Sequence, residues 1–486
     1  MKAWMTYGFN KIVADMPAPS VLKKEFELCL TKGGNGNCQI VVSSDTDTCV
    51  TLKTVSCDGV KCEIFTADHV LTINDHQYTD PLVPYCGDAI TVKEGLSLPF
   101  FLDFKAENAG DYTATFELTE NGNTETFTVS MHVWNFALPE NKTFATACGI
   151  GAGDIARYDQ SEGIYKRYYD FLLEHGMSAY NLPYDILDPR ADEYMSDPRV
   201  TSFVVPSDGD DKVKAYAEKI KSNPVWLEKA LFYSIDEPHS LELIETFKEK
   251  VTRLRDLAPE IPSIVPVYTN LQVGEGKDQF DEMAPYLDLW CPKLCLWEDS
   301  QSYTPFLDYT PEKSFETRIN EIMDKGQKVW SYVCNDPITP YSQMYIDTDG
   351  LMQRLLAWQH YQRKIIGFLY WGVTCWVKGE KTSWEEPFNG IGDGQGRPVY
   401  GCGYLVYPGN PIGYEGPIAT QRLKILRDGL DDVELLSMAE KLFGREWIMA
   451  RVHEATPNLT AYTTYERFEE IRKEIGDAVE SAQKNK

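Results

Sequence analysis

The stretch A-L-F-Y-S-I-D-E-P at residues 230–238 decides how the rest of the chain is interpreted. It is a short apolar run that ends in two adjacent carboxylates and a proline. An apolar run of this length between helical patterns predicts a parallel strand that is covered on both faces. Because Pro238 cannot donate to a sheet ladder, we expect the strand to end at Asp236. Glu237 then turns over the carboxyl end of the strand, beside Asp236.

Alternation along this predicted strand assigns its side chains to two faces. One face carries Phe232, Ser234 and Asp236, and the other carries Leu231, Tyr233 and Ile235. We expect the bulkier second set to lie under the helices and the first set to point to the centre of the sheet or barrel. Two acids at such a strand end are candidates for catalysis. Taken alone they are more typical of ion-paired or helix-capping acids next to a helix that begins at Ser240, and the context of the other strand ends favours catalysis.

Strand and helix patterns alternate on both sides of this stretch. Candidate strands lie at 144–149, 179–183, 201–205, 230–236, 264–269, 287–292, 328–333 and 367–371. The clearest helix covers 240–258, with apolar residues at helical spacing and Ser240 as a natural N-cap. Eight strands in about 230 residues predict a (β/α)8 TIM-type barrel, whose catalytic groups lie at the carboxyl ends of the strands.

The flanking regions have different patterns. Residues 1–138 contain short alternating runs separated by Gly, Asn and Asp turns, at 38–43, 64–73, 98–104, 112–117 and 124–134. This pattern predicts an antiparallel β-sandwich. A Gly-, Pro- and Trp-rich segment at 374–414 is expected to form a loop at the barrel mouth. Helices are predicted at 417–442 and 462–482. The expected organisation is a sandwich domain at 1–138, a catalytic barrel at 139–443 and a C-terminal helical extension at 444–486.

Composition limits the possible partners. The chain has 486 residues, 43% of them hydrophobic, and a formal net charge of −27. This charge argues against nucleic acid and anionic membrane surfaces as partners. No signal-peptide pattern begins the sequence, so we expect a cytoplasmic protein whose 12 cysteines are mostly reduced thiols. The histidines and cysteines lack metal-site spacing, and we expect neither a metal nor another cofactor.

Aromatic and amide side chains are dense at the ends of the other predicted strands. Rings that stack on sugar C–H faces, together with amides and acids that fix hydroxyls, are typical of a carbohydrate site. Each residue alone is more typical of core or rim packing than of a ligand contact. The candidate substrate contacts are Tyr268, Asn270, Trp297, Tyr332, Asn335, Trp371 and Trp376.

Several motifs resemble glycoside hydrolase family 123, the β-N-acetylgalactosaminidases, and related uncharacterised barrel proteins. They are Y-S-I-D-E-P at 233–238, V-W-S-Y-V-C at 329–334, G-F-L-Y-W-G-V-T-C-W at 367–376, G-C-G-Y-L-V-Y-P-G at 401–409 and R-L-K-I-L-R-D-G-L-D-D-V-E at 422–434. The resemblance covers roughly 230–436, and a preceding β-sandwich is also typical of the family. Two positions depart from the wider pattern, since Thr374 stands where Asn is usual and Cys402 where Asp is usual.

The resemblance implies a retaining, substrate-assisted exo-glycosidase. Glu237 would be the general acid, and Asp236 would orient the N–H of the substrate's 2-acetamido group while its carbonyl attacks the anomeric carbon. Tyr332 would contact the acetamido oxygen, and Trp371 and Trp376 would wall the pocket. The implied substrate is a terminal β-linked N-acetylgalactosamine on a glycan, or on an oligosaccharide of glycosphingolipid type.

Other interpretations remain open. The chain could be a glycan-binding barrel without activity, another β-N-acetylhexosaminidase, or an ordinary retaining glycosidase whose nucleophile is an acid such as Asp336. Galactosamine and glucosamine substrates differ by the contacts of one hydroxyl, which the sequence leaves undecided. The charged run at 422–434 favours an ion network that braces the last barrel helix. A substrate site is the less favoured interpretation of this run.

Overall fold

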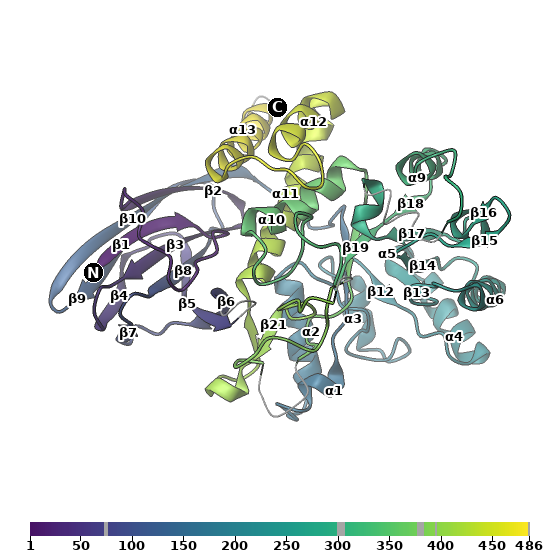
Figure 1. Ribbon diagram of the computed structural model, residues 1–486, viewed down its shortest axis with the longest axis horizontal. Coiled ribbons are helices and arrows are strands. Elements are labelled where there is room, and N and C mark those ends of the chain that lie inside the picture. The colour runs from purple at the N-terminus through teal and green to yellow at the C-terminus, as the bar shows by residue number, and fades with distance from the viewer. Residues whose placement is uncertain (72–75, 299–306, 377–382, 394–395, 485–486) are drawn as a thin grey trace. The chain divides into compact units, whose positions relative to one another are not determined.

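The computed structural model describes residues 1–71, 76–298, 307–376, 383–393 and 396–484 (Figure 1). The chain forms two compact units. The first contains Met1–Pro139, Ser342–Gln359 and Thr374–Lys486, and the second contains Glu140–Tyr341 and His360–Val373. The linear division at residues 138 and 443 stays a prediction. Among the described residues, no helix combines the length and the apolar character that a membrane span needs.

Two five-stranded sheets make up the N-terminal part of the first unit. One sheet has the order β1 (Lys2–Tyr7), β3 (Asn35–Ser43), β8 (Ser97–Lys105), β5 (Lys61–Leu71), β6 (Gln77–Pro84). The other has the order β2 (Glu25–Lys32), β10 (Asn123–Ala137), β9 (Gly110–Glu120), β4 (Thr48–Ser56), β7 (Ile90–Val92). Buried side chains of both sheets form one apolar core, which includes Leu30, Val42, Phe100, Phe116 and Val129. The predicted strand at 64–73 runs partly beyond the described residues, because 72–75 are not among them.

One strand pair differs from the antiparallel prediction. The edge strand β2 runs parallel to β10, whereas the other pairs within these two sheets are antiparallel. After β2 the chain turns at Gly33, whose φ of +71° suits glycine, and enters the other sheet as β3. No hairpin therefore links β2 to β10, and the antiparallel direction that a hairpin imposes does not apply to this pair.

Short parallel strands and their helices make up the second unit. The strands are β11 (Ala145–Cys148), β12 (Phe203–Val204), β13 (Ala230–Tyr233), β14 (Ser263–Val267), β17 (Leu289–Pro292), β18 (Lys328–Val329), β19 (Ser331–Val333) and β20 (Gly367–Tyr370). They pair in the orders β11-β20-β19 and β12-β13-β14-β17-β18. Isolated parallel bridges join Cys148 to Ala179 and Lys293 to Tyr332. The predicted strand at 179–183 is thus reduced to a bridge at Ala179.

The helices follow these strands along the chain. They are α1 (Ala152–Ile155), α2 (Ile164–Glu174), α3 (Ala191–Ser196), α4 (Asp210–Lys221), α5 (Pro224–Lys229), α6 (Leu241–Leu257), α7 (Gln279–Met283), the 3-10 turn η2 (Leu294–Trp297) and α9 (Phe315–Asp324). A small hairpin, β15 (Gln272–Gly274) and β16 (Lys277–Asp278), precedes α7. The predicted helix at 240–258 is confirmed as α6, and Ser240 caps it by accepting a hydrogen bond of 3.2 Å from the Leu243 amide.

The interior face of β13 is opposite to the predicted one. Leu231 and Tyr233 belong to the apolar cluster that the second unit's strands share, whose members include Ala147, Ile264, Leu289, Tyr332 and Leu369. Phe232 is also buried, but outside this cluster. Side-chain size was a poor guide because both faces of a covered parallel strand are buried. The strand also ends at Tyr233, three residues before Asp236, so alternation does not continue to the acids.

The C-terminal part of the first unit is helical. It contains α10 (Gly350–Gln362, which continues into the second unit), the strands β21 (Val406–Pro408) and β22 (Pro417–Ala419) with the turn η3 (Asn410–Ile412), and the helices α11 (Gln421–Phe443), α12 (Arg445–Ala455) and α13 (Tyr465–Lys484). The predicted helices at 417–442 and 462–482 are confirmed as α11 and α13, with shifted ends.

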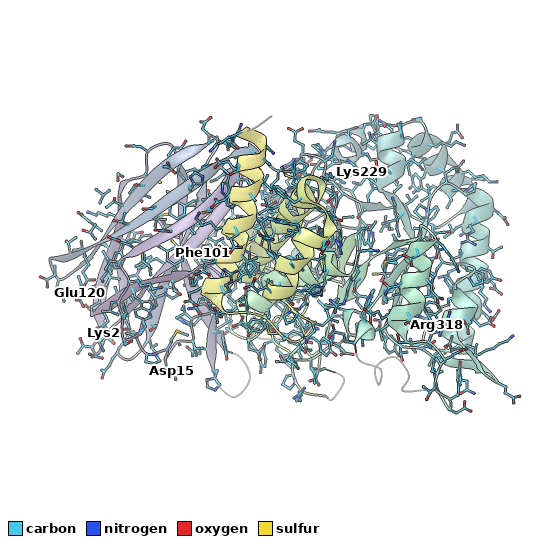
Figure 2. All side chains as sticks on the ribbon, turned by 90° about the horizontal axis from the view of Figure 1, so that it is seen from above. Lys2, Asp15, Phe101, Glu120, Lys229 and Arg318 are labelled. Atoms are coloured by element: carbon cyan, nitrogen blue, oxygen red, sulfur yellow. The ribbon has the colours of Figure 1, made fainter. Side chains whose placement is uncertain are left out.

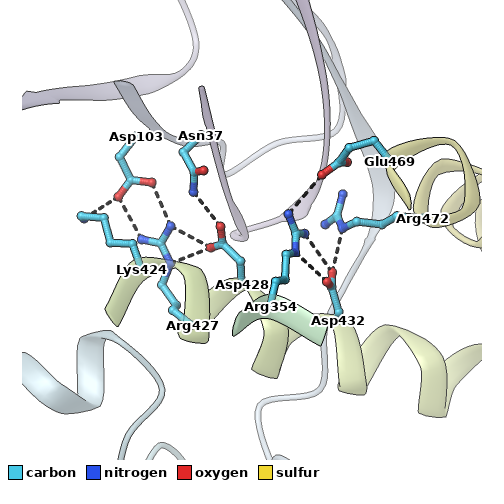
Figure 3. Close-up of polar contacts among 9 residues, drawn as sticks. All are labelled: Asn37, Asp103, Arg354, Lys424, Arg427, Asp428, Asp432, Glu469 and Arg472. Atoms are coloured by element: carbon cyan, nitrogen blue, oxygen red, sulfur yellow. Dashed lines mark hydrogen bonds and ion pairs between the residues drawn. The ribbon is translucent and has the colours of Figure 1, made fainter. Parts of the chain in front are cut away.

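The helix α11 covers the outer face of the first sheet. In β8, Phe100 and Leu102 point into the shared core, whereas Phe101 (Figure 2) packs in a separate cluster and Asp103 reaches α11. Lys424 Nζ and both terminal nitrogens of Arg427 donate to the Asp103 carboxylate at 2.6–2.9 Å (Figure 3). The charged run at 422–434 therefore braces this helix, as predicted.

Candidate active site

The acid pair lies in the turn that follows β13. Asp236 is exposed at a bend and Glu237 is half-buried. Glu237 has a φ of +37°, in the left-handed region that costs an L-residue roughly 1–2 kcal/mol. The following Pro238 restricts its backbone further. Strain of this kind persists only where the surrounding structure imposes it, and it is concentrated at functional sites.

Glu237 is held by a tyrosine from a different strand. Tyr332 on β19 is 2% exposed, and its hydroxyl donates a short hydrogen bond to Glu237 Oε1. Burial raises the pKa of Glu237, the hydrogen bond from Tyr332 lowers it, and the neighbouring charge of Asp236 raises it, with a raised pKa as the result. A carboxyl group with a raised pKa can keep a proton at a pH where an ordinary glutamate has lost it.

Asp236 is held by a tyrosine of the strand that precedes it. The hydroxyl of Tyr233, the last residue of β13, donates to Asp236 Oδ1 at 2.8 Å. The Tyr233 ring packs against Tyr180 with 5.6 Å between centroids. Tyr233 was not among the predicted site residues, because a strand that continued to Asp236 would place the two side chains on opposite faces.

A buried lysine, Lys293, also lies in this group and was not among the predicted site residues. Lys293 follows β17, is 3% exposed, and forms a short ion pair with Asp336. Its ammonium lies 5.3 Å from the ring centroid of Tyr268, and its positive charge lowers the pKa of Glu237. Asp336, the alternative nucleophile, is thus paired with a cation. The isolated parallel bridge between Lys293 and Tyr332 reveals this group, because 38 residues of chain lie between the two in the sequence.

His239 completes the surroundings of Glu237. Its Nδ1 lies 2.7 Å from the backbone oxygen of Glu237, and its ring centroid is 6.0 Å from that of Tyr268. His239 lies between Glu237 and the start of α6, and its contact with the Glu237 backbone supports the strained turn. Tyr268 is a predicted substrate contact, and the structure brings it close to this group.

The other predicted substrate contacts of the second unit have varied surroundings. Asn270 uses its amide within the protein, donating to Asp278 at 2.9 Å and accepting from the Phe280 amide at 3.1 Å. Trp297 is buried and packs on Phe315 with 5.3 Å between centroids. Their sugar contacts stay predictions.

Trp371 and Asn335 follow strand ends. Trp371 comes directly after β20 and is half-buried, and its indole Nε1 has no hydrogen-bond partner among the described residues. Asn335 lies just beyond β19, is half-buried, and accepts from the Cys334 thiol at 3.1 Å. The sugar contacts of Trp371 and Asn335 stay predictions.

Trp376 belongs to the first unit. It is 1% exposed, and its Nε1 donates to the backbone oxygen of Val406 at 2.9 Å. Thr374 and Cys402, the two positions that depart from the family pattern, are buried in the same unit. Residues 377–382 and 394–395 of the predicted mouth loop lie outside the described residues.

A separate cavity of about 330 Å³ opens at the amino ends of the strands. Its lining includes Ser202, Ala230, Leu289 and Lys229 (Figure 2), and neither acid is part of it. The Lys229 ammonium donates to two backbone oxygens at 3.1 and 2.7 Å. The acid pair thus lies at the opposite end of β13 from this cavity.

These features define a class of protein. A glycoside hydrolase typically uses a pair of carboxyl groups, one of which has a raised pKa. Here such a pair lies at the carboxyl end of a parallel strand, where barrel enzymes carry their catalytic groups. The sequence model of the Glycoside hydrolase 123 catalytic domain matches residues 193–439, which include both acids, Tyr332 and Lys293. The chain belongs to glycoside hydrolase family 123, and its substrates are carbohydrates.

One solved structure agrees with this assignment at the level of the fold. A family 123 glycoside hydrolase from Clostridium perfringens, studied for glycolipid glycan hydrolysis, has a TM-score of 0.64 and 11% identity over 99% of this chain and 98% of that chain. A family 39 glycoside hydrolase from Bacteroides cellulosilyticus WH2 has a TM-score of 0.34 and 10% identity over 84% and 81% of the two chains. No curated protein sequence matches the chain significantly.

Proposed function

We propose that the protein is a retaining, substrate-assisted exo-β-N-acetylgalactosaminidase. The observation that carries this proposal is the adjacent pair Asp236–Glu237, with a raised pKa on Glu237 and a separate hydroxyl on each carboxylate. Family membership and the glycolipid glycans of the Clostridium perfringens enzyme support a terminal β-linked N-acetylgalactosamine as the substrate. Glycans, glycoconjugates and glycosphingolipid-type oligosaccharides would all present it.

In this proposal the two acids divide the work. Glu237 gives its proton to the glycosidic oxygen as the bond to the anomeric carbon breaks. The acetamido oxygen of the substrate attacks the same carbon and forms an oxazolinium-type intermediate, so that no protein nucleophile is needed. Asp236 accepts a hydrogen bond from the acetamido N–H and balances the positive charge that develops there. Glu237, now ionised, removes a proton from the water that opens the intermediate, with overall retention.

Tyr332 suits a role that depends on the protonation of Glu237. A phenol has one O–H to donate, and it also has an oxygen that can accept. Beside an ionised Glu237 the Tyr332 hydroxyl donates to the carboxylate, as in the structure. Beside a protonated Glu237 it can accept from the acid and donate to the acetamido oxygen, which is the contact that the family resemblance implies.

The proposed architecture is a β-sandwich followed by a catalytic (β/α)8 barrel. The barrel is supported by the parallel pairs and by the bridge from Lys293 to Tyr332, which links the two groups of parallel strands. A second bridge joins Cys148 of β11 to Ala179. A main-chain hydrogen bond of 2.8 Å from Val204 to Tyr180 adds a further link. The sandwich is supported by the core that the two N-terminal sheets share.

A panel of p-nitrophenyl glycosides tests the proposed function. We expect release of p-nitrophenol from the β-N-acetylgalactosaminide, and little or none from the α-anomer or the plain β-galactoside, because only the β-acetamido sugar can assist its own cleavage. Comparable turnover of the plain β-galactoside would contradict substrate assistance and favour a protein nucleophile such as Asp336. Faster turnover of the β-N-acetylglucosaminide would change the sugar and keep the mechanism.

A further inference from the structure

We propose that Tyr233 is a positioning residue that fixes Asp236 in the orientation needed to receive the substrate's acetamido N–H. This inference rests on the proposed function and adds a residue to it. It begins from the hydrogen bond of 2.8 Å between the Tyr233 hydroxyl and Asp236 Oδ1.

The local chain geometry explains why this hydrogen bond forms. β13 ends at Tyr233, and the chain bends at Asp236 instead of continuing the pleat. In a continuing strand, residues three apart point to opposite faces. The early end of the strand therefore lets the Asp236 carboxylate return over the hydroxyl of the residue three positions before it.

Tyr233 is a firm support for an otherwise exposed acid. Its ring packs in the apolar cluster of the second unit and against Tyr180. Burial raises the pKa of Tyr233 far above its usual value, so its hydroxyl stays protonated and can only be a neutral donor to the acid. Asp236 is exposed, and without such a donor its side chain would be free to change rotamer.

The hydrogen bond also leaves the right atom available. An ionised carboxylate has two oxygens that accept hydrogen bonds. Tyr233 occupies Oδ1 of Asp236, which leaves Oδ2 to accept the acetamido N–H. Tyr332 holds Glu237 in a similar way from another strand, so each acid has a tyrosine of its own.

A double-mutant cycle with Tyr233→Phe and Asp236→Asn tests the inference. We expect Y233F to lower kcat on the p-nitrophenyl β-N-acetylgalactosaminide by roughly 10- to 100-fold, the value of a hydrogen bond to a charged group. The same factor should apply to a sugar leaving group, because Asp236 acts on the acetamido group whichever group departs. Binding of an oxazoline-like thiazoline inhibitor should weaken in parallel. In the D236N background, Y233F should cost little more, since its effect passes through the aspartate.

Tyr194→Phe is the matched control. Tyr194 on α3 donates to Asp170 on α2 at 2.9 Å, so this variant also removes a tyrosine–aspartate hydrogen bond of the second unit. We expect Y194F to keep both kcat and inhibitor affinity. A thermal unfolding midpoint for each variant separates loss of folding from loss of positioning.

The outcomes distinguish the inference from the proposed function. If wild-type enzyme requires the acetamido group but Y233F retains full kcat and inhibitor affinity, the inference is wrong and the proposed function stands. Additive losses in the double variant would also overturn it, because Tyr233 would then act independently of Asp236. If wild-type enzyme cleaves the plain β-galactoside equally well, both are overturned. A non-additive cycle with weakened thiazoline binding supports the inference.

Discussion

At the scale of the residue, the site depends on opposing influences on Glu237. Burial and the neighbouring Asp236 favour its protonated form, whereas the Tyr332 hydroxyl and the charge of Lys293 favour the ionised form. A general acid that later becomes a general base needs both forms to be accessible, and its pKa should lie near the working pH. The pKa of Glu237 is raised above that of an ordinary glutamate, and is therefore closer to neutral pH.

Replacing Glu237 by Gln should therefore lower the catalytic rate by a factor that depends on the leaving group. General acid catalysis is worth roughly 10²–10⁴-fold, and a sugar leaving group should lose much of that range, whereas p-nitrophenolate departs with little help. In wild-type enzyme, kcat/KM for the sugar substrate should fall as the pH rises through the raised pKa of Glu237, because only the protonated acid is active. The E237Q variant should lack this alkaline limb. Steady-state kinetics across pH with both substrates measure each effect.

Asp236→Asn provides the comparison for this prediction. In the proposed mechanism the charge of Asp236 supports the acetamido group whichever group leaves, so both substrates should slow by similar factors in this variant. The roles would be reversed if D236N spared the activated substrate while E237Q slowed both equally. Azide rescue of an Asp236→Ala variant with inverted product would show that Asp236 is a covalent nucleophile.

The place of the two adjacent carboxylates after a strand could be predicted from sequence, but the contacts that hold them could not. Asp236 and Glu237 are adjacent in the chain and follow an apolar run, so a local pattern was sufficient. Lys293 and Tyr332 come together through pairing between strands, which no local pattern records. Tyr233 depended on where β13 ends, and the exact end of a strand is among the features that sequence patterns determine least well.

At the scale of the element, α11 explains why the N-terminal sheet carries buried charges. Asp103 on β8 binds Lys424 and Arg427, and Asn37 on β3 donates to Asp428 at 2.6 Å (Figure 3). Further along the helix, Asp432 accepts from Arg354 and Arg472. The charged run at 422–434 was a reliable indication of bracing. Its partners Asp103 and Asn37, however, lie more than 300 residues earlier in the chain, beyond the reach of local patterns.

Replacing Asp103 by Ala should destabilise the protein severely. The change leaves Lys424 and Arg427 buried without their shared carboxylate, and breaking a buried pair in this way costs about 3–5 kcal/mol. Burial raises the pKa of Asp103, but Arg427 and Lys424 outweigh it and hold the pKa well below its usual range. The stability that Asp103 contributes is therefore present above the pKa of an unfolded aspartate, about 4, and should be lost as the pH falls below it.

Urea unfolding at neutral and acidic pH measures this effect. Asp47→Ala is the matched control, because Asp47 pairs with Lys93 at 2.8 Å on the exposed surface, where an ion pair contributes little. A D103A variant as stable as D47A at neutral pH would show that the α11 network does not support the fold.

At the scale of the whole molecule, each compact unit combines segments that are far apart in the sequence. Ser342–Gln359 and Thr374–Lys486 group with the N-terminal sheets rather than with the strands around them. Patterns in the sequence identified many of the strands and helices, yet grouping them requires knowledge of which distant faces are complementary. The family match at 193–439 likewise extends over both units, so the matched segment alone is not a compact body.

A protein that begins at residue 139 should therefore fail to fold by itself, even though it contains the whole family match. Such a fragment lacks Asp80, which binds the fully buried Arg422 through two hydrogen bonds of 2.6 and 2.8 Å, and it lacks Asp103. Arg422 would lose the carboxylate of Asp80, and Lys424 and Arg427 would lose that of Asp103, while Arg427 keeps its pair with Asp428. Each uncompensated buried charge costs several kcal/mol against a total stability of about 5–15 kcal/mol. Thermal unfolding of the fragment, followed by circular dichroism, should show no cooperative transition, and p-nitrophenyl glycoside hydrolysis should be absent. Co-expression of residues 1–138 as a separate chain should restore both, because it returns the missing carboxylates. A monomeric fragment with a cooperative transition and full activity would show that the N-terminal sheets are dispensable for the fold of the catalytic region.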